Sequence, residues 1–201
     1  MEKTQKLGAG TFGNVTGKNG EANKKFKTLK HFIQEVVLTL YMKESRYILN
    51  LLKYDIGRLE MKTERWSCSL RDSYSKVKFS EKQREIIFID MLKGLSHLHE
   101  RQIVHSDFKP SNILVNIKTG RAIICDLGLS SVMMYAKKDQ TAPAYRPKET
   151  KHTYGHDMFG LCLTSYELLS GNPIPKAHMK DSYYDKRRNR TMYHFKQSDN
   201  C

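Results

Sequence analysis

The sequence predicts an α+β fold in two lobes, with strands over roughly the first 60 residues and helices over most of the rest. Residues 7–27 are typical of three strands joined by a glycine-rich turn and by Asn19-Gly20, the commonest signal for a two-residue hairpin loop. Later segments carry apolar residues at helical spacing. With 201 residues, 39% of them hydrophobic, the chain can form one domain, or two small lobes around a cleft, with a real core.

The first helix is predicted over residues 28–43, because apolar residues recur there at positions i, i+3, i+4 and i+7. These residues, expected to face the core, are Ile33, Val36, Val37 and Leu40. Short apolar runs within residues 47–61 predict two strands, and the polar residues 62–79 include a connector.

The second half of the chain contains two longer predicted helices. Ser80 and Gln83 form a capping-box pattern that opens a helix running to about His99. The residues expected on its inner face are Ile86, Ile89, Leu92 and Leu95. Short strands are predicted at 103–104, 113–115 and 122–125, a loop at 130–156 and a loosely packed tail at 174–201. The second helix is predicted over residues 157–170, with Gly171 and Pro173 ending it.

Composition excludes several classes of protein. Lys and Arg total 35 against 21 Asp and Glu, which gives a formal charge of +14. This charge permits an acidic partner, and its even spread along the chain argues against a detachable basic arm. The four cysteines form no Cys-x-x-Cys pair, which predicts free thiols rather than a zinc site. No secretory signal or apolar run of membrane-spanning length is present, so the expected location is the cytoplasm or nucleus and no membrane partner is expected.

The first motif is a glycine-rich turn, in which Gly8, Gly10, Gly13 and Val15 complete a G-x-G-x-x-G-x-V pattern. Glycines allow a backbone to approach phosphate oxygens closely. A dinucleotide-binding turn would be followed at once by a helix. A hairpin follows here, so the dinucleotide interpretation is disfavoured.

The hairpin predicts which residues lie opposite each other. A two-residue loop at Asn19-Gly20 pairs Val15 with Lys24, and places Ala22 two residues away on the face of Lys24. Val15 and Ala22 can then clamp a flat apolar ring while Lys24 reaches its phosphates. The alternative is that the lysines between positions 24 and 30 are simply a solvated basic run.

The strongest motif is the polar loop of residues 105–112, which is followed by a predicted strand. Asp107 can accept a proton from a hydroxyl, Lys109 can neutralise phosphate charge, and Asn112 can bind a divalent cation. Asp126 stands at the end of the next predicted strand, before a glycine, where it suits a second ligand for a phosphate-bound Mg²⁺.

Taken in order, these pieces resemble a eukaryotic-type Ser/Thr protein kinase: glycine-rich loop, Lys, a helix with Glu35, catalytic loop, Asp-x-Gly and an apolar helix that begins with Asp157. The resemblance covers about residues 7–175. It implies a kinase-like domain over 1–175, with a strand-rich N-lobe of about 1–64 and a helical C-lobe of about 65–175 that stops after the central apolar helix. A basic tail would occupy 176–201.

The resemblance also implies roles for individual residues. Asp107 would be the catalytic base, Lys109 would stabilise the transferring phosphoryl group, and Asn112 and Asp126 would bind Mg²⁺. Residues 61–64 would be the hinge beside adenine, and Asp157 would brace the catalytic loop. The implied contacts to ATP are Leu7, Gly8, Gly10, Gly13, Val15, Ala22, Lys24, Glu35, Met61 and Leu114.

The chain departs from the family pattern at several positions. Ser106 replaces the Arg that precedes the catalytic Asp and normally binds a phosphate on the activation segment, which implies activity without that phosphorylation. Leu127 replaces the Phe of Asp-Phe-Gly. Residues 147–149 read Pro-Lys-Glu where Ala-Pro-Glu is expected, and Ala142 stands at the usual activation-segment Thr, with Thr141 one place off.

Two stretches are shorter than in the family. Only 11 positions separate Lys24 from Glu35, which leaves Lys30 as a rival for the phosphate-binding lysine. Only 30 residues follow Gly171, where the family has several more helices. Such a reduced form resembles kinases of large DNA viruses.

Two functions are consistent with these observations, and a third is disfavoured. The first is a Ser/Thr protein kinase that uses ATP and Mg²⁺ and acts on a protein substrate, with acidic substrates favoured by the charge. The alternative is a kinase-shaped decoy or scaffold for a host kinase or its partner. Nucleic-acid binding is not expected, because the charge is evenly spread and no nucleic-acid module is recognisable. The sequence leaves the oligomeric state open.

Overall fold

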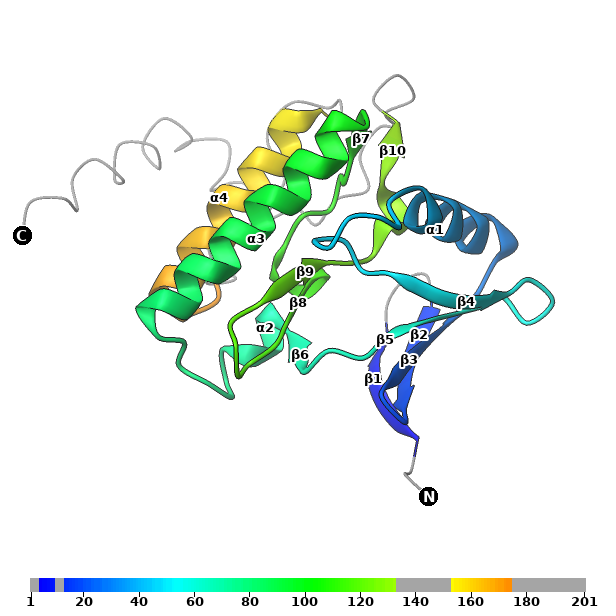
Figure 1. Ribbon diagram of the computed structural model, residues 1–201, viewed down its shortest axis with the longest axis horizontal. Coiled ribbons are helices and arrows are strands. Elements are labelled where there is room, and N and C mark those ends of the chain that lie inside the picture. The colour runs from blue at the N-terminus through cyan, green and yellow to red at the C-terminus, as the bar shows by residue number, and fades with distance from the viewer. Residues whose placement is uncertain (1–3, 10–12, 133–152, 175–201) are drawn as a thin grey trace, which may run out of the picture.

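The computed structural model describes residues 4–9, 13–132 and 153–174 (Figure 1). Within these ranges a five-stranded antiparallel sheet with one helix forms the N-terminal part, and a helical part with short strands follows. Gly10 and the tail at 176–201 lie outside the described residues. No helix in the described ranges is long and apolar enough to cross a membrane.

The N-terminal sheet has the strand order β1-β2-β3-β5-β4. Its members are β1 (Gln5–Ala9), β2 (Gly13–Lys18), β3 (Glu21–Phe26), β4 (Leu51–Asp55) and β5 (Glu60–Glu64). The predicted hairpin is confirmed: β2 and β3 turn at Asn19 and Gly20, both with positive φ, and Val15 pairs with Lys24. The positive φ of both turn residues is what a two-residue hairpin loop requires.

Helix α1 (Leu29–Tyr41) forms where a helix was predicted, but it packs through a different face. Its buried residues are Phe32, Glu35, Val36 and Thr39, whereas the predicted inner residues Ile33, Val37 and Leu40 are exposed. Phe32 meets Phe26 of β3 edge to face, with ring centroids 5.6 Å apart. Because both faces of α1 carry apolar residues, this aromatic contact and the burial of Glu35 decide which face turns inward.

The predicted hinge at residues 61–64 is wrong. These residues belong to strand β5, and Met61 is buried in the core of the N-terminal part, beside Phe26, Phe32 and Val36. Its side chain therefore packs under the sheet and is not part of a connector. The link to the helical part is residues 65–67, which lead into β6 (Cys68–Ser69) and α2 (Leu70–Ser73), two elements that were not predicted.

The helical part is built on two long helices, α3 (Glu81–Glu100) and α4 (Tyr154–Ser170), which lie side by side in Figure 1. The predicted capping box of α3 is confirmed, since Ser80 and Gln83 each bond to the other's backbone N–H. Its inner face is rotated from the predicted one: Leu95 is buried as expected, but Ile89 and Leu92 are exposed. The apolar residues that are buried instead are Ile87, Met91 and Leu98.

Short strands of the helical part place its polar loops. A three-stranded sheet has the order β6-β8-β9, with β8 at Ile113–Val115 and β9 at Ala122–Ile124, and β7 (Ile103–Val104) pairs with β10 (Ser131–Val132). Two single turns of 3-10 helix, η1 (Pro110–Asn112) and η2 (Leu127–Leu129), precede β8 and follow β9. Gly171 ends α4 as predicted, in the left-handed conformation with φ 68°.

Candidate active site

The glycine-rich turn lies at the end of the β1–β2 hairpin, and the structure describes Gly8 and Gly13 of it. Gly13 must be glycine, because a Cβ there would collide with the backbone carbonyl of Lys25 on the adjacent strand. No atom of the described residues lies within 4 Å of the position where Gly8 would carry a Cβ. Among the described residues, the backbone at Gly8 is therefore uncovered, and the one at Gly13 is close-packed against β3.

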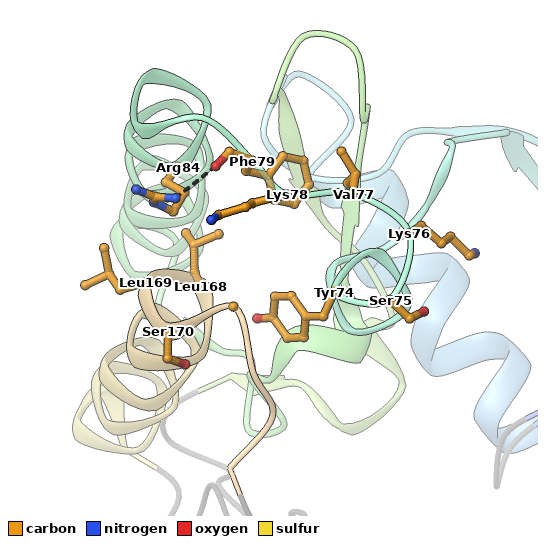
Figure 2. Close-up of a pocket in the computed structure, with 11 residues that line it drawn as sticks. Tyr74, Ser75, Lys76, Val77, Lys78, Phe79, Arg84, Leu168, Leu169 and Ser170 are labelled. Carbon is orange, nitrogen blue, oxygen red and sulfur yellow. Dashed lines mark hydrogen bonds between the residues drawn. The ribbon is translucent and has the colours of Figure 1, made fainter.

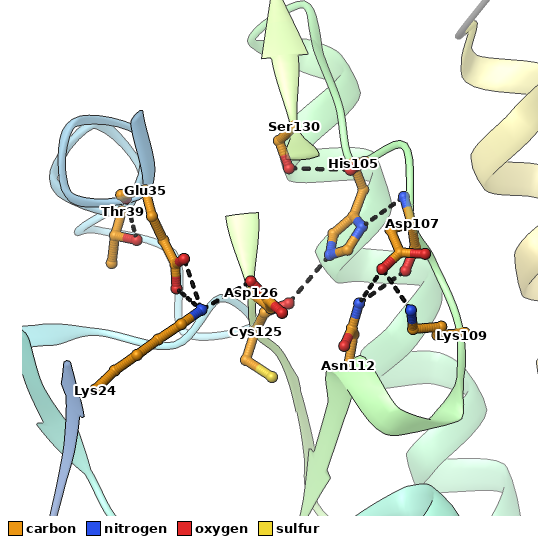
Figure 3. Close-up of polar contacts among 10 residues, drawn as sticks. All are labelled: Lys24, Glu35, Thr39, His105, Asp107, Lys109, Asn112, Cys125, Asp126 and Ser130. Atoms are coloured by element: carbon orange, nitrogen blue, oxygen red, sulfur yellow. Dashed lines mark hydrogen bonds and ion pairs between the residues drawn. The ribbon is translucent and has the colours of Figure 1, made fainter. Parts of the chain in front are cut away.

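Lys24 is the centre of an ion network that joins the two parts of the chain (Figure 3). Its ammonium lies 2.8 and 2.7 Å from the two carboxylate oxygens of Glu35 on α1 and 2.9 Å from Oδ1 of Asp126. Lys30, the rival lysine, is exposed in the first turn of α1. The short spacing between Lys24 and Glu35 thus does not prevent their pairing.

The charges of this network perturb one another. Burial alone would lower the pKa of Lys24, but the two carboxylates outweigh burial and raise it. Burial raises the pKa of Glu35 to about 7, against the opposing attraction of Lys24. Burial would also raise the pKa of Asp126, but the charge of Lys24 prevails and holds it below its usual value. Lys24 therefore stays a cation at neutral pH, and Asp126 stays an anion.

A second polar cluster occupies the loop between β7 and β8. The ammonium of Lys109 donates to Oδ2 of Asp107 at 2.6 Å. The side-chain amide of Asn112 donates to the same oxygen at 3.1 Å and to the backbone carbonyl of Asp107 at 2.9 Å. Figure 3 shows Asp126 between Lys24 on one side and Asp107 and Asn112 on the other. One carboxylate is thus oriented by two donors from its own loop.

Asp157, in the first turn of α4, supports this loop from inside the protein. Its fully buried carboxylate accepts the backbone N–H groups of His105 at 2.8 Å and Ser106 at 2.9 Å. Ser106 has a φ of 68°, a left-handed conformation that is unfavourable for a non-glycine residue. The carboxylate therefore holds a strained backbone next to Asp107, as the bracing interaction predicted for Asp157 requires.

His99 also contacts Asp157, through Nε2 at 2.8 Å from Oδ2. The sequence identified His99 only as an ordinary helix residue, and its position near the end of a predicted helix carries no signal for this contact. His105 was not assigned a role either, yet its ring contacts the carbonyl of Cys125 at 3.1 Å. His99 thus connects α3 to α4, and His105 connects the polar loop to the segment that follows β9.

Asp126 lies two residues after the end of β9 and has a φ of 62°. Its side chain is 34% exposed, whereas Leu127 beside it is buried in the main core. A second contact between the parts lies nearby, where Gln34 of α1 donates to the carbonyl of Ser130 at 2.9 Å. The turn after β9 thus anchors an apolar side chain and leaves the Asp126 carboxylate accessible.

The remaining predicted ligand contacts lie on the sheets that flank the site. Leu7 is 37% exposed on β1, and Val15 and Ala22 are partly buried on β2 and β3. Leu114 is partly buried on β8, between Ser69 of β6 and Ile123 of β9. Met61, as described above, lies in the core of the N-terminal part.

Comparison with known proteins agrees with this arrangement. A model of the protein kinase domain matches residues 1–200. A probable serine/threonine-protein kinase of Arabidopsis thaliana is 30% identical over 87% of this chain and 35% of that protein. Cyclin-dependent kinase C-2 C of the same plant is 28% identical over 88% of this chain and 32% of that protein. Serine/threonine-protein kinase STK11 of Gallus gallus is 27% identical over 76% and 37%. The chain spans about a third of the length of these relatives.

Proposed function

Because the chain belongs to the protein kinase family, we propose that it is an active Ser/Thr kinase that transfers the γ-phosphoryl group of ATP to protein hydroxyls. The observation that carries the proposal is that two polar clusters are linked through His105, whose ring contacts the carbonyl of Cys125 and accepts the backbone N–H of Asp107 (Figure 3). One contains Lys24, Glu35 and Asp126, and the other contains Asp107 and Lys109. Positioning and charge neutralisation provide most of the catalysis in phosphoryl transfer, so the retention of these groups favours an enzyme.

Lys24 is proposed to hold the α- and β-phosphates of ATP. Its ammonium already has two carboxylate neighbours, of which Asp126 is ionised at neutral pH and Glu35, with its pKa raised to about 7, is partly ionised. The cluster therefore carries a partial negative charge in excess. Such a site favours a divalent cation that arrives with phosphate oxygens. The accessible carboxylate of Asp126 and the amide oxygen of Asn112 are the ligand types that Mg²⁺ prefers. When bound, Mg²⁺ would neutralise charge on the phosphates.

Asp107 is proposed to accept the proton of the substrate hydroxyl. Lys109 and Asn112 both donate to Oδ2 of Asp107, and these two bonds fix the direction of the carboxylate that would take the proton. Lys109 carries its positive charge within 2.6 Å of this carboxylate. The same ammonium would stabilise the negative oxygens of the phosphoryl group as it moves.

Ser106 supports a further proposal, that activity does not depend on a phosphorylated activation segment. In this chain the residue before Asp107 offers a hydroxyl in place of a guanidinium, and Ser106 Oγ donates to the carbonyl of Val104 at 3.4 Å. Treatment with a Ser/Thr phosphatase should therefore leave the rate of transfer unchanged. A loss of activity that renewed phosphorylation restores would contradict this point.

The test is transfer of radiolabel from γ-labelled ATP to a panel of Ser/Thr protein and peptide substrates by the wild-type chain and by Asp107→Asn. Wild type should label at least one substrate, and the variant should be slower by about 10²- to 10⁴-fold, the usual contribution of a general base. Equal labelling by both would refute the assignment of Asp107. Tight binding of ATP with no transfer to any substrate would favour the alternative of a kinase-shaped binding module.

A further inference from the structure

A groove lies on the helical part, between the loop that joins α2 to α3 and the C-terminal end of α4 (Figure 2). It is lined by residues 74–79, Arg84 and residues 168–171. None of these residues belongs to the clusters around Lys24 and Asp107. The groove is therefore a separate surface of the molecule.

Bonds between residues next to the groove hold its two walls together. Arg71 of α2 lies 3.2 Å from a carboxylate oxygen of Glu167 on α4, and Glu167 is fully buried. The same oxygen accepts the backbone N–H of Ile174 at 2.9 Å. On the other wall, Arg84 donates to the carbonyl of Phe79 at 2.8 Å and fixes the loop against α3. The groove is preformed, so a ligand would not have to assemble it.

The lining combines apolar and basic side chains. Leu169 is 69% exposed, the highest exposure among the large hydrophobic residues of the described ranges, and it lines the groove together with Tyr74 and Val77 of the loop. Lys78 extends across the groove toward Arg84 and Leu168 in Figure 2. No Asp or Glu is among the residues that line it in the described part of the chain.

We propose that this groove docks an acidic segment of the protein substrate, in which a large apolar side chain is flanked by Asp or Glu. The apolar side chain would cover Leu169 and Tyr74, and the carboxylates would pair with Lys78 and Arg84. This proposal rests on the proposed kinase function and names a second contact for its substrate.

Charge favours such a partner over the other occupants of the groove. Residues 176–201 contain seven Lys or Arg and three Asp, so this segment would be repelled by Lys78 and Arg84. A second copy of the chain carries a net charge of +14 and would be repelled in the same way. An acidic partner is attracted both by the groove and by the rest of the protein.

Helix α4 relates the groove to the catalytic loop, since Asp157 at one end supports the loop and Leu169 at the other lines the groove. The 12 positions between them correspond to about 18 Å along the helix at 1.5 Å per residue. An extended peptide covers about 3.3 Å per residue, so about six residues are the minimum between docking segment and phosphorylated hydroxyl.

The binding test uses a labelled peptide of nine residues with three leucines among Asp and Glu, and Asp107→Asn protein, so that no catalysis is needed. Fluorescence anisotropy should detect binding that weakens at least fivefold in Lys78→Glu. The matched control is Lys118→Glu, which makes the same charge change at an exposed lysine outside the groove. A peptide with alanine in place of leucine should also bind at least fivefold more weakly.

Reversing the charge of the peptide distinguishes a loss of charge pairing from misfolding of the Lys78→Glu variant. A peptide with lysine in place of Asp and Glu should bind Lys78→Glu at least threefold more tightly than wild type, which a damaged protein would not do. Equal affinities of the acidic peptide for Lys78→Glu and Lys118→Glu would overturn the proposal. Loss of peptide binding through self-association at the groove would overturn it too.

The contribution to turnover is measured on two fused substrates that differ only in the acidic segment, placed ten residues from the phosphorylated hydroxyl. The segment should lower KM at least fivefold in wild type and not in Lys78→Glu, with kcat unchanged. If neither substrate is phosphorylated although the peptide binds, the proposed kinase function is refuted and the proposed peptide binding at the groove stands. If both substrates are phosphorylated with the same KM, the proposed docking is refuted and the kinase function stands.

Discussion

The support of the catalytic loop by Asp157 predicts a large effect from a nearly isosteric change, Asp157→Asn. The carboxylate faces three nitrogen atoms: the backbone nitrogens of His105 and Ser106 and the Nε2 of His99. An Asn amide keeps one acceptor oxygen and turns an NH₂ group toward a backbone N–H. A hydrogen bond to a charged group contributes about 1.5–3 kcal/mol, and a buried unmatched donor costs about 1–3 kcal/mol.

These two effects overlap, so we expect the free energy of unfolding to fall by about 3 kcal/mol. That is a large share of the roughly 5–15 kcal/mol of a typical domain. The strained φ of Ser106 would then relax and displace Asp107. A misplacement of about 1 Å at a catalytic group can cost about 10²-fold in rate, so kcat should fall by a similar factor.

Denaturant unfolding and phosphoryl transfer measure the two effects. The control is Glu100→Gln, which removes an exposed carboxylate at the end of α3 and should change stability by less than about 0.5 kcal/mol. If Asp157→Asn unfolds at the same denaturant concentration as Glu100→Gln and keeps wild-type kcat, the carboxylate does not hold the loop and the reasoning is refuted.

Three further predictions concern Glu35, Gly160 and Cys125. Since burial raises the pKa of Glu35 to about 7, kcat/KM should fall as the pH drops through 7 and Glu35 takes up a proton. The variant Glu35→Gln should lose this limb of the pH profile and be slower above pH 7. If the limb persists in Glu35→Gln, it belongs to another group and the prediction is wrong. A Cβ on Gly160 would lie 2.5 Å from the carbonyl oxygen of Phe108, so Gly160→Ala should lower the free energy of unfolding by about 1–3 kcal/mol and should also lower kcat. The control is Gly155→Ala, whose Cβ would meet only a side-chain oxygen at 3.3 Å and which should change neither quantity. Burial raises the pKa of the Cys125 thiol, so iodoacetamide should label the exposed Cys162 at least tenfold faster than Cys125. The two labelling rates can be measured by mass spectrometry, and equal rates would contradict this prediction.

The parts of the site that the sequence predicted are those that local chain geometry determines. A two-residue turn at Asn19-Gly20 sets the cross-strand register, so the pairing of Val15 with Lys24 follows from the turn alone. Asp107, Lys109 and Asn112 lie within six residues of each other, and one loop brings them together. The choice between Lys24 and Lys30 was left open, because it depends on the packing of α1 against the sheet.

The parts that were wrong depend on packing between distant elements. Ile33 and Val37 have the same helical spacing as buried residues, but the contact of Phe32 with Phe26 turns them to the surface. The family resemblance implied a hinge at residues 61–64, but these residues pair with β3 as part of β5, and the connector is residues 65–67. The link from His99 to Asp157 joins two residues of different helices, 58 positions apart in the chain, which no local pattern predicts.

The central claim is that Asp107 performs chemistry at a site that binds ATP with Mg²⁺ through other residues. Both properties can be measured on the same preparations of wild type and Asp107→Asn: affinity for ATP with Mg²⁺, and the single-turnover rate of transfer to a Ser/Thr substrate. We predict affinities within about threefold of each other and a transfer rate at least about 10²-fold lower in the variant. Equal transfer rates at equal affinity would contradict the claim.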